Sequence, residues 1–191
     1  MADPAERLSL PYAEYLAREA NSDVKHEYVN GEVYAMAGGT IEHGALIFQV
    51  GGLIRAALAN GPCIGFSSDV RVRISAFNRS YYPDLSVVCG KVERASDDSQ
   101  AIVNPTVIVE VLSESTELYD RGEKSWHYRT LPSLREYVLV SQDKKRVEVF
   151  ERGANGTWVL REAGPNEGIR VASISLDLSV NEIYQGQIYD A

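Results

Sequence analysis

The sequence lacks any apolar run long enough to cross a membrane. Its 191 residues contain no stretch of about 18 consecutive apolar residues, the length at which a helix spans a bilayer. The segment 1–7 also lacks the basic region followed by an apolar region that marks a secretory signal. We therefore expect a cytoplasmic protein with no membrane partner.

Cysteine is scarce. The chain has only Cys63 and Cys89, and neither belongs to the closely spaced Cys or His pairs that bind zinc. We expect both to be buried small residues in a reducing cytoplasm.

Positive charge is also in short supply. The chain has 19 Lys and Arg against 27 Asp and Glu, a formal net charge of −8. Phosphate contacts need cations, so this balance argues against a protein that coats nucleic acid without specificity. It still permits an enzyme with a local basic groove, whose acidic residues a bound metal would partly neutralise. The 45% hydrophobic content, without a linker or low-complexity tract, predicts one domain over residues 1–191.

The apolar pattern predicts alternating helices and strands. Helical spacing predicts a short helix over 9–19 with Ser9 as its N-cap, a long helix over 43–60 and a helix from Ser115 or Thr116 to about Arg129. Period-two patterns predict a hairpin around Asn30-Gly31 and strands over 70–74, 81–89, 135–140, 146–152 and 157–162. The nearly continuous apolar run 106–112 predicts a central strand covered on both faces. This order predicts a mixed α/β sandwich.

Two of these strand-like runs each contain one acidic residue where an apolar one is expected. The run 81–88 holds Asp84, and the run 105–113 holds Glu110. Burying an unpaired carboxylate costs several kcal/mol, and two carboxylates on neighbouring strands repel each other unless a cation lies between them. Hard oxygen ligands suit Mg²⁺ or Mn²⁺. The pair therefore predicts a divalent metal site and metal-assisted hydrolysis.

Simpler interpretations of the two acids remain open. Asp84 follows Pro83, and an aspartate at a turn or strand start beside proline is common. Glu110 has no such explanation unless it pairs with a buried arginine, for which Arg71 or Arg73 is available.

Five short motifs, in their order and spacing, resemble those of a known family. They are Asn-Gly-Glu-Val (30–33), Ser-Asp-Val-Arg-Val-Arg-Ile (68–74), Tyr-Tyr-Pro-Asp (81–84), Glu-Val-Leu-Ser (110–113) and Asp-Arg-Gly-Glu-Lys (120–124). The region 12–152 resembles the Uma family, a large bacterial group of presumed endonucleases in the PD-(D/E)xK superfamily. The resemblance implies a restriction-endonuclease-like mixed central sheet flanked by helices, here with an extra N-terminal hairpin and C-terminal antiparallel strands. It also implies a divalent metal, frequent homodimers and DNA hydrolysis.

The sequence departs from the superfamily at its lysine. The expected position, two residues after Glu110, is Leu112. The resemblance implies that Lys124 on the following helix takes this role. Asp120, Lys124 and Tyr128 follow one another at intervals of four and so share a helix face. The same spacing also fits an ordinary Asp–Lys pair on the surface.

Two further residues enter through the resemblance. Glu32 matches an early acid of the family, although a polar residue after the glycine of a hairpin is ordinary. His43 matches a position near the cleft, although a histidine at the start of a helix is more often a core or capping residue.

The sequence thus predicts a metal-dependent endonuclease that acts on DNA, with Mg²⁺ or Mn²⁺ at Asp84 and Glu110. Lys124, Glu32 and His43 would complete the catalytic set. Leu112 and the net charge favour one alternative, an inactive nuclease fold that serves as a binding or regulatory module. The other alternative is a metal-dependent hydrolase of another phosphoester, such as a nucleotide.

Overall fold

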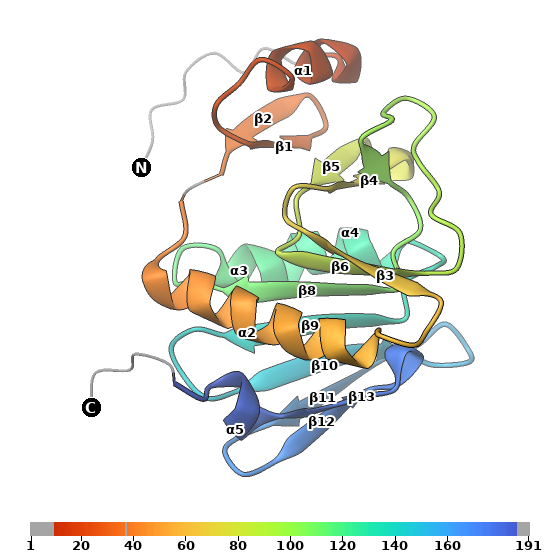
Figure 1. Ribbon diagram of the computed structural model, residues 1–191. Helices are drawn as coiled ribbons and strands as arrows, with labels where there is room; N and C mark the ends of the chain where they lie inside the picture. The colour runs from red at the N-terminus through yellow and green to blue at the C-terminus, as the bar shows by residue number, and fades with distance from the viewer. Residues whose placement is uncertain (1–9, 37, 187–191) are drawn as a thin grey trace.

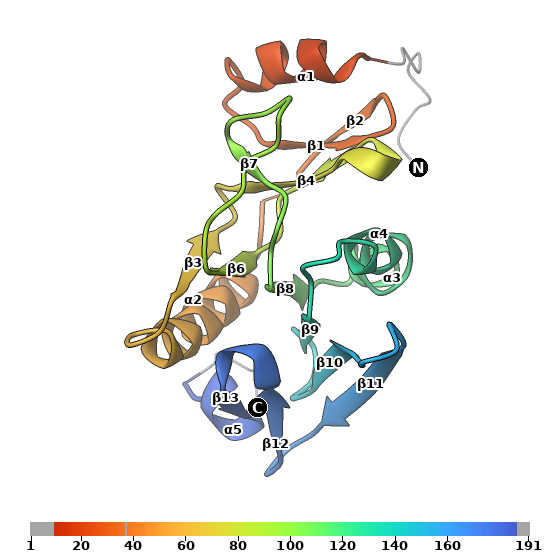
Figure 2. The same ribbon diagram turned by 90° about the vertical axis from the view of Figure 1, so that its right-hand side faces the viewer.

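Three β-sheets and a few helices make up the structure, a computed structural model that describes residues 10–36 and 38–186. The α-helices are α1 (Tyr12–Glu19), α2 (Ile41–Ala57), α3 (Glu117–Tyr119), α4 (Ser125–Arg129) and α5 (Val180–Ile183). A π-helical segment, Asp120–Lys124, joins α3 to α4, and short 3₁₀ helices occupy Ser75–Phe77 and Ala172–Ile174. Figures 1 and 2 show α1 and a smaller sheet above a larger sheet, which has α2 on one side and α3 and α4 on the other.

The smaller sheet has five strands in the order β2-β1-β5-β4-β7. They are β1 (His26–Val29), β2 (Glu32–Ala35), β4 (Arg71–Ile74), β5 (Arg79–Tyr81) and β7 (Ala101–Ile102). β1 and β2 form the predicted hairpin, in which Asn30 and Gly31 both adopt positive φ, as a tight two-residue turn requires. Tyr15 of α1 packs on Tyr28 of β1, and this contact fastens the helix to the sheet.

The larger sheet has six strands in the order β11-β10-β9-β8-β6-β3. They are β3 (Cys63–Ser67), β6 (Leu85–Cys89), β8 (Val107–Leu112), β9 (Glu136–Ser141), β10 (Val147–Arg152) and β11 (Trp158–Ala163). β8 lies antiparallel to β6 and parallel to β9, and all six of its residues are buried. The predicted central strand is confirmed.

The two faces of β8 belong to two separate hydrophobic clusters. Val107, Val109 and Val111 pack with Leu46 and Val50 of α2. The alternate apolar residues of β8 join a second cluster that includes the aromatic side of α4. Because side chains alternate along a strand, this one strand supports both helical layers.

The C-terminal part covers α2 and the far strands of the larger sheet. β12 (Gly168–Val171) and β13 (Leu176–Ser179) form an antiparallel hairpin, followed by α5. Ile169, Leu178 and Ile183 from these elements are buried in the same cluster as α2. The expected mixed α/β architecture, with an N-terminal hairpin and C-terminal antiparallel strands, is confirmed.

Three details of the expected elements are different. The run 81–89 is not one strand: it divides into β5 and β6, which belong to different sheets, because Pro83 cannot donate a backbone hydrogen bond. β3 was not expected, since glycine interrupts its alternation. Ser9, the expected N-cap of the first helix, lies outside the described residues, and Pro11 occupies the N-cap position of α1. No helix in the described part of the chain is long and apolar enough to span a membrane.

The expectation for the cysteines is wrong. Cys63 and Cys89 form a disulfide and are half-buried rather than fully buried. They lie opposite each other in the antiparallel β3–β6 pair, and this register brings their side chains together. Sequence alone showed two unrelated cysteines, because the partner strand β3 was not recognised.

Reducing this disulfide should lower the free energy of unfolding by about 2–4 kcal/mol, since the bond closes a loop in the unfolded chain. Urea denaturation with and without dithiothreitol measures the difference. The Cys63→Ser/Cys89→Ser variant serves as the control, since reductant should leave its stability unchanged. Two reactive thiols in unreduced, denatured wild-type protein would contradict the pairing.

Candidate active site

Asp84 and Glu110 meet at one end of the β6–β8 pair. Leu85 lies opposite Val109, so Asp84, one residue earlier, falls opposite Glu110. The backbone N–H of Asp84 donates to Glu110 Oε2 at 3.3 Å, and the N–H of Val111 donates to Asp84 Oδ2 at 2.7 Å. Both acids are buried, and both line a cavity of about 390 Å³. The two predicted acids therefore converge on one hollow.

Lys124 lies within the same cluster. Its Nζ is 3.0 Å from Glu110 Oε1, 3.0 Å from Glu27 Oε1 and 3.5 Å from Asp120 Oδ1. Lys124 is only 6% exposed, so its contact with Asp120 is not an ordinary surface pair. An ammonium group has three N–H donors, and here each faces a carboxylate.

The helical segment after β8 directs a whole face toward Glu110, as the spacing predicts. Asp120, Lys124 and Tyr128 are all buried. Tyr128 donates its hydroxyl hydrogen to Glu110 Oε1 at 3.2 Å, and the hydroxyl of Tyr137 on β9 donates to the backbone carbonyl of Asp120 at 2.9 Å. The turn that carries Asp120 and Lys124 is π-helical, a rare form that is frequent at functional sites.

Burial and charge shift the ionisation of Glu110 and Lys124. Desolvation raises the pKa of Glu110 well above its usual value; Lys124 opposes this, and the carboxylates of Asp120 and Asp84 add to it. Burial disfavours the charged form of Lys124, but Glu110 and Glu27 outweigh it, so the pKa of Lys124 lies well above its usual value. The site thus holds a permanent cation and a carboxyl group that ionises reluctantly.

His43 approaches from the other helical layer. It lies in the first turn of α2, where Thr40 caps the helix by accepting the backbone N–H of His43 at 3.1 Å. Its Nε2 lies 3.1 Å from the carbonyl oxygen of Val111 and 3.4 Å from Asp84 Oδ2. The hydrogen bond with Asp84 raises the pKa of His43, against the lowering effect of burial. His43 therefore contacts the site, as the resemblance implies.

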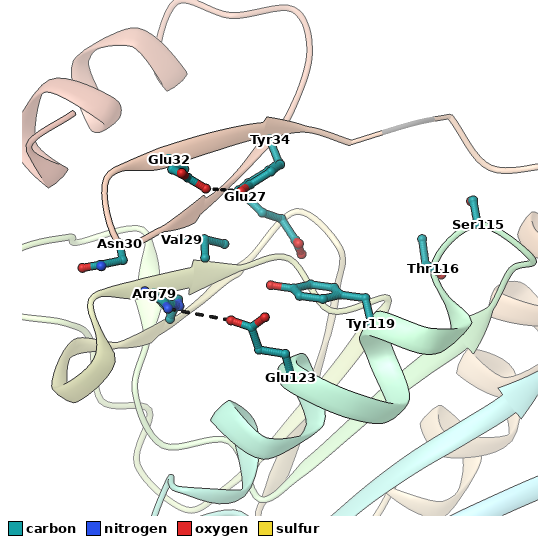
Figure 3. A pocket seen from close by; sticks show the side chains of 10 residues that line it. All are labelled: Glu27, Val29, Asn30, Glu32, Tyr34, Arg79, Ser115, Thr116, Tyr119 and Glu123. Atoms are coloured by element: carbon teal, nitrogen blue, oxygen red, sulfur yellow. Dashed lines mark hydrogen bonds and ion pairs between the residues drawn. The ribbon is translucent and has the colours of Figure 1, made fainter. Parts of the chain in front are cut away.

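Glu32 lies apart from the other four predicted residues. It lines a second cavity of about 650 Å³, and its carboxylate bonds to the hydroxyl group of Tyr34 (Figure 3). The two cavities adjoin, since both are lined by Glu27, Tyr34, Ser115 and Thr116. The structure therefore brings Asp84, Glu110, Lys124 and His43 together and places Glu32 in the adjoining cavity.

Glu27 is the site residue that the sequence interpretation missed. In the hairpin, Glu27 pairs with Tyr34 and Val29 pairs with Glu32, so all four side chains occupy one face. Glu27 lies nearer the larger sheet and reaches Lys124, whereas Glu32 does not. The alternation of side chains in the segment His-Glu-Tyr-Val (26–29) was the available signal. Glu27 lies two residues before Val29, so both side chains are on the same face of the strand.

The suggested arginine partners of Glu110 bind elsewhere. Arg71 makes a two-pronged pair with Asp98, with distances of 2.8 and 2.9 Å, and Arg73 pairs with Asp97 at 2.9 Å. Both pairs belong to the smaller sheet and its neighbouring loop. The cation that permits Glu110 to be buried is Lys124, so this alternative is wrong.

The donor atoms fit a divalent cation with few protein ligands. Among the described residues no group of three or more His, Cys, Asp or Glu side chains is arranged to hold a metal. Asp84 and Glu110 nevertheless offer two carboxylates beside the carbonyl of Val111, and no described residue hydrogen-bonds to Asp84 Oδ1. Mg²⁺ typically takes one or two carboxylates and keeps several waters. These residues could therefore hold Mg²⁺ or Mn²⁺.

Replacing Lys124 by methionine should lower the free energy of unfolding by about 3–5 kcal/mol, because Glu27 and Glu110 lose the ammonium group that contacts them. Burial raises the pKa of Glu110 in the folded protein, and without the opposing effect of Lys124 this pKa rises further. A group with a raised folded pKa loses stability as the pH rises above its ordinary pKa, so the loss should grow as the pH rises from acidic to neutral values. Urea denaturation across this range measures it.

The matched control is Lys25→Met. Lys25 pairs with Asp69 at 2.6 Å on the surface, where such a pair contributes about 0.2–1 kcal/mol. The double variant Lys124→Met/Glu110→Gln should recover part of the loss. Equal effects of the two lysine variants would show that the buried cluster does not depend on its cation.

The pKa of His43 should fall in Asp84→Asn, because burial then acts without the opposing hydrogen bond. In the wild type a raised pKa means that His43 stabilises the fold below its ordinary pKa and that this contribution is lost as the pH rises through the folded value. NMR titration of the ring signals in metal-free buffer measures the change. His26, which pairs with Glu19, is the internal control, and an unshifted His43 would contradict the contact.

Comparisons with known proteins bear on the family and the fold of the chain. The model of the Uma2 family, described as putative restriction endonuclease, matches residues 12–181. The uncharacterized protein slr1290 of Synechocystis sp. is 35% identical over 173 residues, covering 91% of this chain and 90% of that protein. A second protein of that organism, sll1609, is 34% identical over 153 residues, covering 80% and 86%.

A solved structure shows a similar fold. The crystal structure of a putative nuclease belonging to DUF820 from Anabaena variabilis superposes with a TM-score of 0.74, at 17% identity, over 90% of this chain and 95% of that one. At this identity the likeness shows the fold, which is the one that the sequence motifs implied. The family match covers most of the chain and includes all of the converging acids. The chain therefore belongs to the Uma2 family of putative restriction endonucleases.

Proposed function

We propose that the protein hydrolyses phosphodiester bonds of DNA with a divalent metal at Asp84 and Glu110. The observation that carries the proposal is the convergence of these acids with Lys124 and His43 around one cavity. Four carboxylates, counting Glu27 and Asp120, meet one lysine and one histidine there. This surplus of negative charge favours the binding of a metal cation. A phosphate group also needs that cation, because the carboxylates would otherwise repel it.

Asp84 and Glu110 would hold Mg²⁺ or Mn²⁺, with the carbonyl of Val111 beside them. A bound metal of this kind lowers the pKa of a coordinated water and offsets charge on a phosphoryl oxygen. The contacts of the protein prepare both acids for this role. Val111 N–H fixes one oxygen of Asp84, while Lys124 and Tyr128 hold one oxygen of Glu110.

Lys124 would stabilise charge on the scissile phosphate or polarise the attacking water. Its high pKa keeps the ammonium group charged at any physiological pH. At 3.5 Å, Asp120 is the most distant of its three partners, so an incoming oxygen can replace that contact at the lowest cost. His43 Nε2 lies between two oxygen acceptors, Asp84 Oδ2 and the carbonyl of Val111, so a proton on Nε2 would orient Asp84. A role for Glu32 stays a prediction.

Plasmid nicking tests this function. With Mg²⁺ or Mn²⁺ the wild type should nick DNA, and Asp84→Asn should lower the rate at least about 100-fold, because a hard oxygen ligand is lost. Lys124→Met and Glu110→Gln should also lower the rate strongly. Chelation with EDTA should abolish nicking and a return of Mg²⁺ should restore it.

Asp177→Asn is the control, since Asp177 forms an exposed pair with Arg170 on the distant C-terminal hairpin. Nicking that is absent, or equal in wild type and Asp84→Asn, would refute the nuclease proposal. Calorimetry then separates the alternatives: Mn²⁺ binding that Glu110→Gln abolishes would indicate a binding module with an intact site. Turnover of small phosphoesters but not of DNA would indicate a different hydrolase. The homodimer and the cytoplasmic location stay predictions.

A further inference from the structure

The larger cavity adjoins the catalytic hollow but is lined by neither Asp84 nor Glu110. Its volume of about 650 Å³ lies within the range of about 300–1,000 Å³ typical of small-molecule sites. Figure 3 shows the hairpin on one side of it and the α3 segment on the other. The shared wall residues Glu27, Tyr34, Ser115 and Thr116 make the two hollows one continuous surface. A polymer held at the carboxylates could therefore extend into this cavity.

Two aromatic rings line the cavity, one from each of the two elements on its opposite sides. Tyr34 comes from β2 and is 50% exposed, and Tyr119 comes from α3 and projects into the hollow in Figure 3. The hydroxyl of Tyr119 is held at 3.1 Å from that of Tyr81, which fixes its ring. Exposed aromatic faces are suited to stack on planar groups such as nucleobases.

The charge of the cavity selects against phosphate. Glu27, Glu32 and Glu123 line it, and Arg79 is the only basic residue among its described lining residues. Carboxylates accept hydrogen bonds from the exocyclic amino groups of nucleobases but repel phosphate oxygens. The group that fits here is therefore neutral, flat and equipped with amino donors.

The guanidinium group of Arg79 adds a hydrogen-bond donor to the cavity. Its Nη1 donates to the carbonyl of Phe77 at 2.9 Å, but its Nη2 lies 3.8 Å from Glu123 Oε1, too far for a hydrogen bond. The pair thus offers a donor and an acceptor side by side at the edge of the cavity. This is the combination that a base edge can satisfy.

We propose that this cavity takes an unpaired nucleobase of the DNA strand whose adjacent phosphate lies at Asp84 and Glu110. This inference rests on the proposed function and specifies its substrate: a single-stranded, mismatched or bulged site rather than a fully paired duplex. In paired DNA the base would first have to leave the stack, which costs a few kcal/mol, and a site that is already unpaired avoids this cost.

Binding to two short duplexes tests the inference without cleavage. The two duplexes differ only in whether one 2-aminopurine is paired or unpaired. Binding is measured in the presence of Ca²⁺, by fluorescence anisotropy and by the fluorescence of the 2-aminopurine. The wild type should bind the duplex with the unpaired base about tenfold tighter and quench its fluorescence, as stacking on an aromatic ring predicts. Tyr34→Leu should lose this preference, and Tyr34→Phe should keep it. Phe48→Leu is the control, since Phe48 is 83% exposed on α2 and lines neither cavity.

The outcomes separate this inference from the proposed function. Equal binding of both duplexes, or a preference that Tyr34→Leu leaves unchanged, overturns the inference even if the protein nicks DNA. A preference that depends on Tyr34 supports the base site even if no nicking occurs, and in that case only the hydrolytic proposal fails. If neither duplex is preferred and Glu123→Gln abolishes Mn²⁺ binding, the cavity is a cation site and the inference is wrong.

Discussion

The buried ammonium group of Lys124 is the interaction on which the arrangement of the site depends. It lies 3.0 Å from carboxylates of Glu27 on β1 and Glu110 on β8, and 3.5 Å from Asp120 on its own helical segment. Each of these acids would be costly to bury alone, and together they would repel one another. One cation therefore fixes the N-terminal hairpin, the central strand and the following helix relative to each other. The same contacts that stabilise the fold hold the candidate catalytic groups in place.

The acidic net charge of the chain is compatible with a local binding site for a metal and a phosphate. A net charge of −8 is unfavourable for a protein that binds DNA through its whole surface. In the hollow, Asp84 and Glu110 add negative charge that Lys124 and His43 do not fully offset, so a phosphate and a divalent cation would favour each other there. Under the proposed function, affinity for DNA would be coupled to metal occupancy and would come from a small region. The rings of Tyr34 and Tyr119 in the adjoining cavity would contribute contacts that do not depend on charge.

The site residues could be predicted to different degrees, for physical reasons that differ. Asp84 and Glu110 stood out because a carboxylate among β-branched residues is costly. Lys124 followed from its spacing with neighbours on a helix face. Glu27 and Glu32 occupy the same face of one hairpin, and only the position of that hairpin against the larger sheet decides which acid reaches Lys124. The sequence could therefore indicate an acid on this hairpin but not the contact between Glu27 and Lys124.

Local patterns in the sequence determined the elements and the two acids: apolar periodicity specifies the long helix and the central strand, and Asn30-Gly31 specifies the hairpin. These signals are short-range, because they reflect backbone geometry and burial of one face. The tertiary structure alone decided the division of 81–89 between two sheets, the pairing of Cys63 with Cys89, and the meeting of three carboxylates at Lys124. Each of these depends on contacts between segments far apart in the chain, and no local spacing encodes which distant strand or side chain will be the partner.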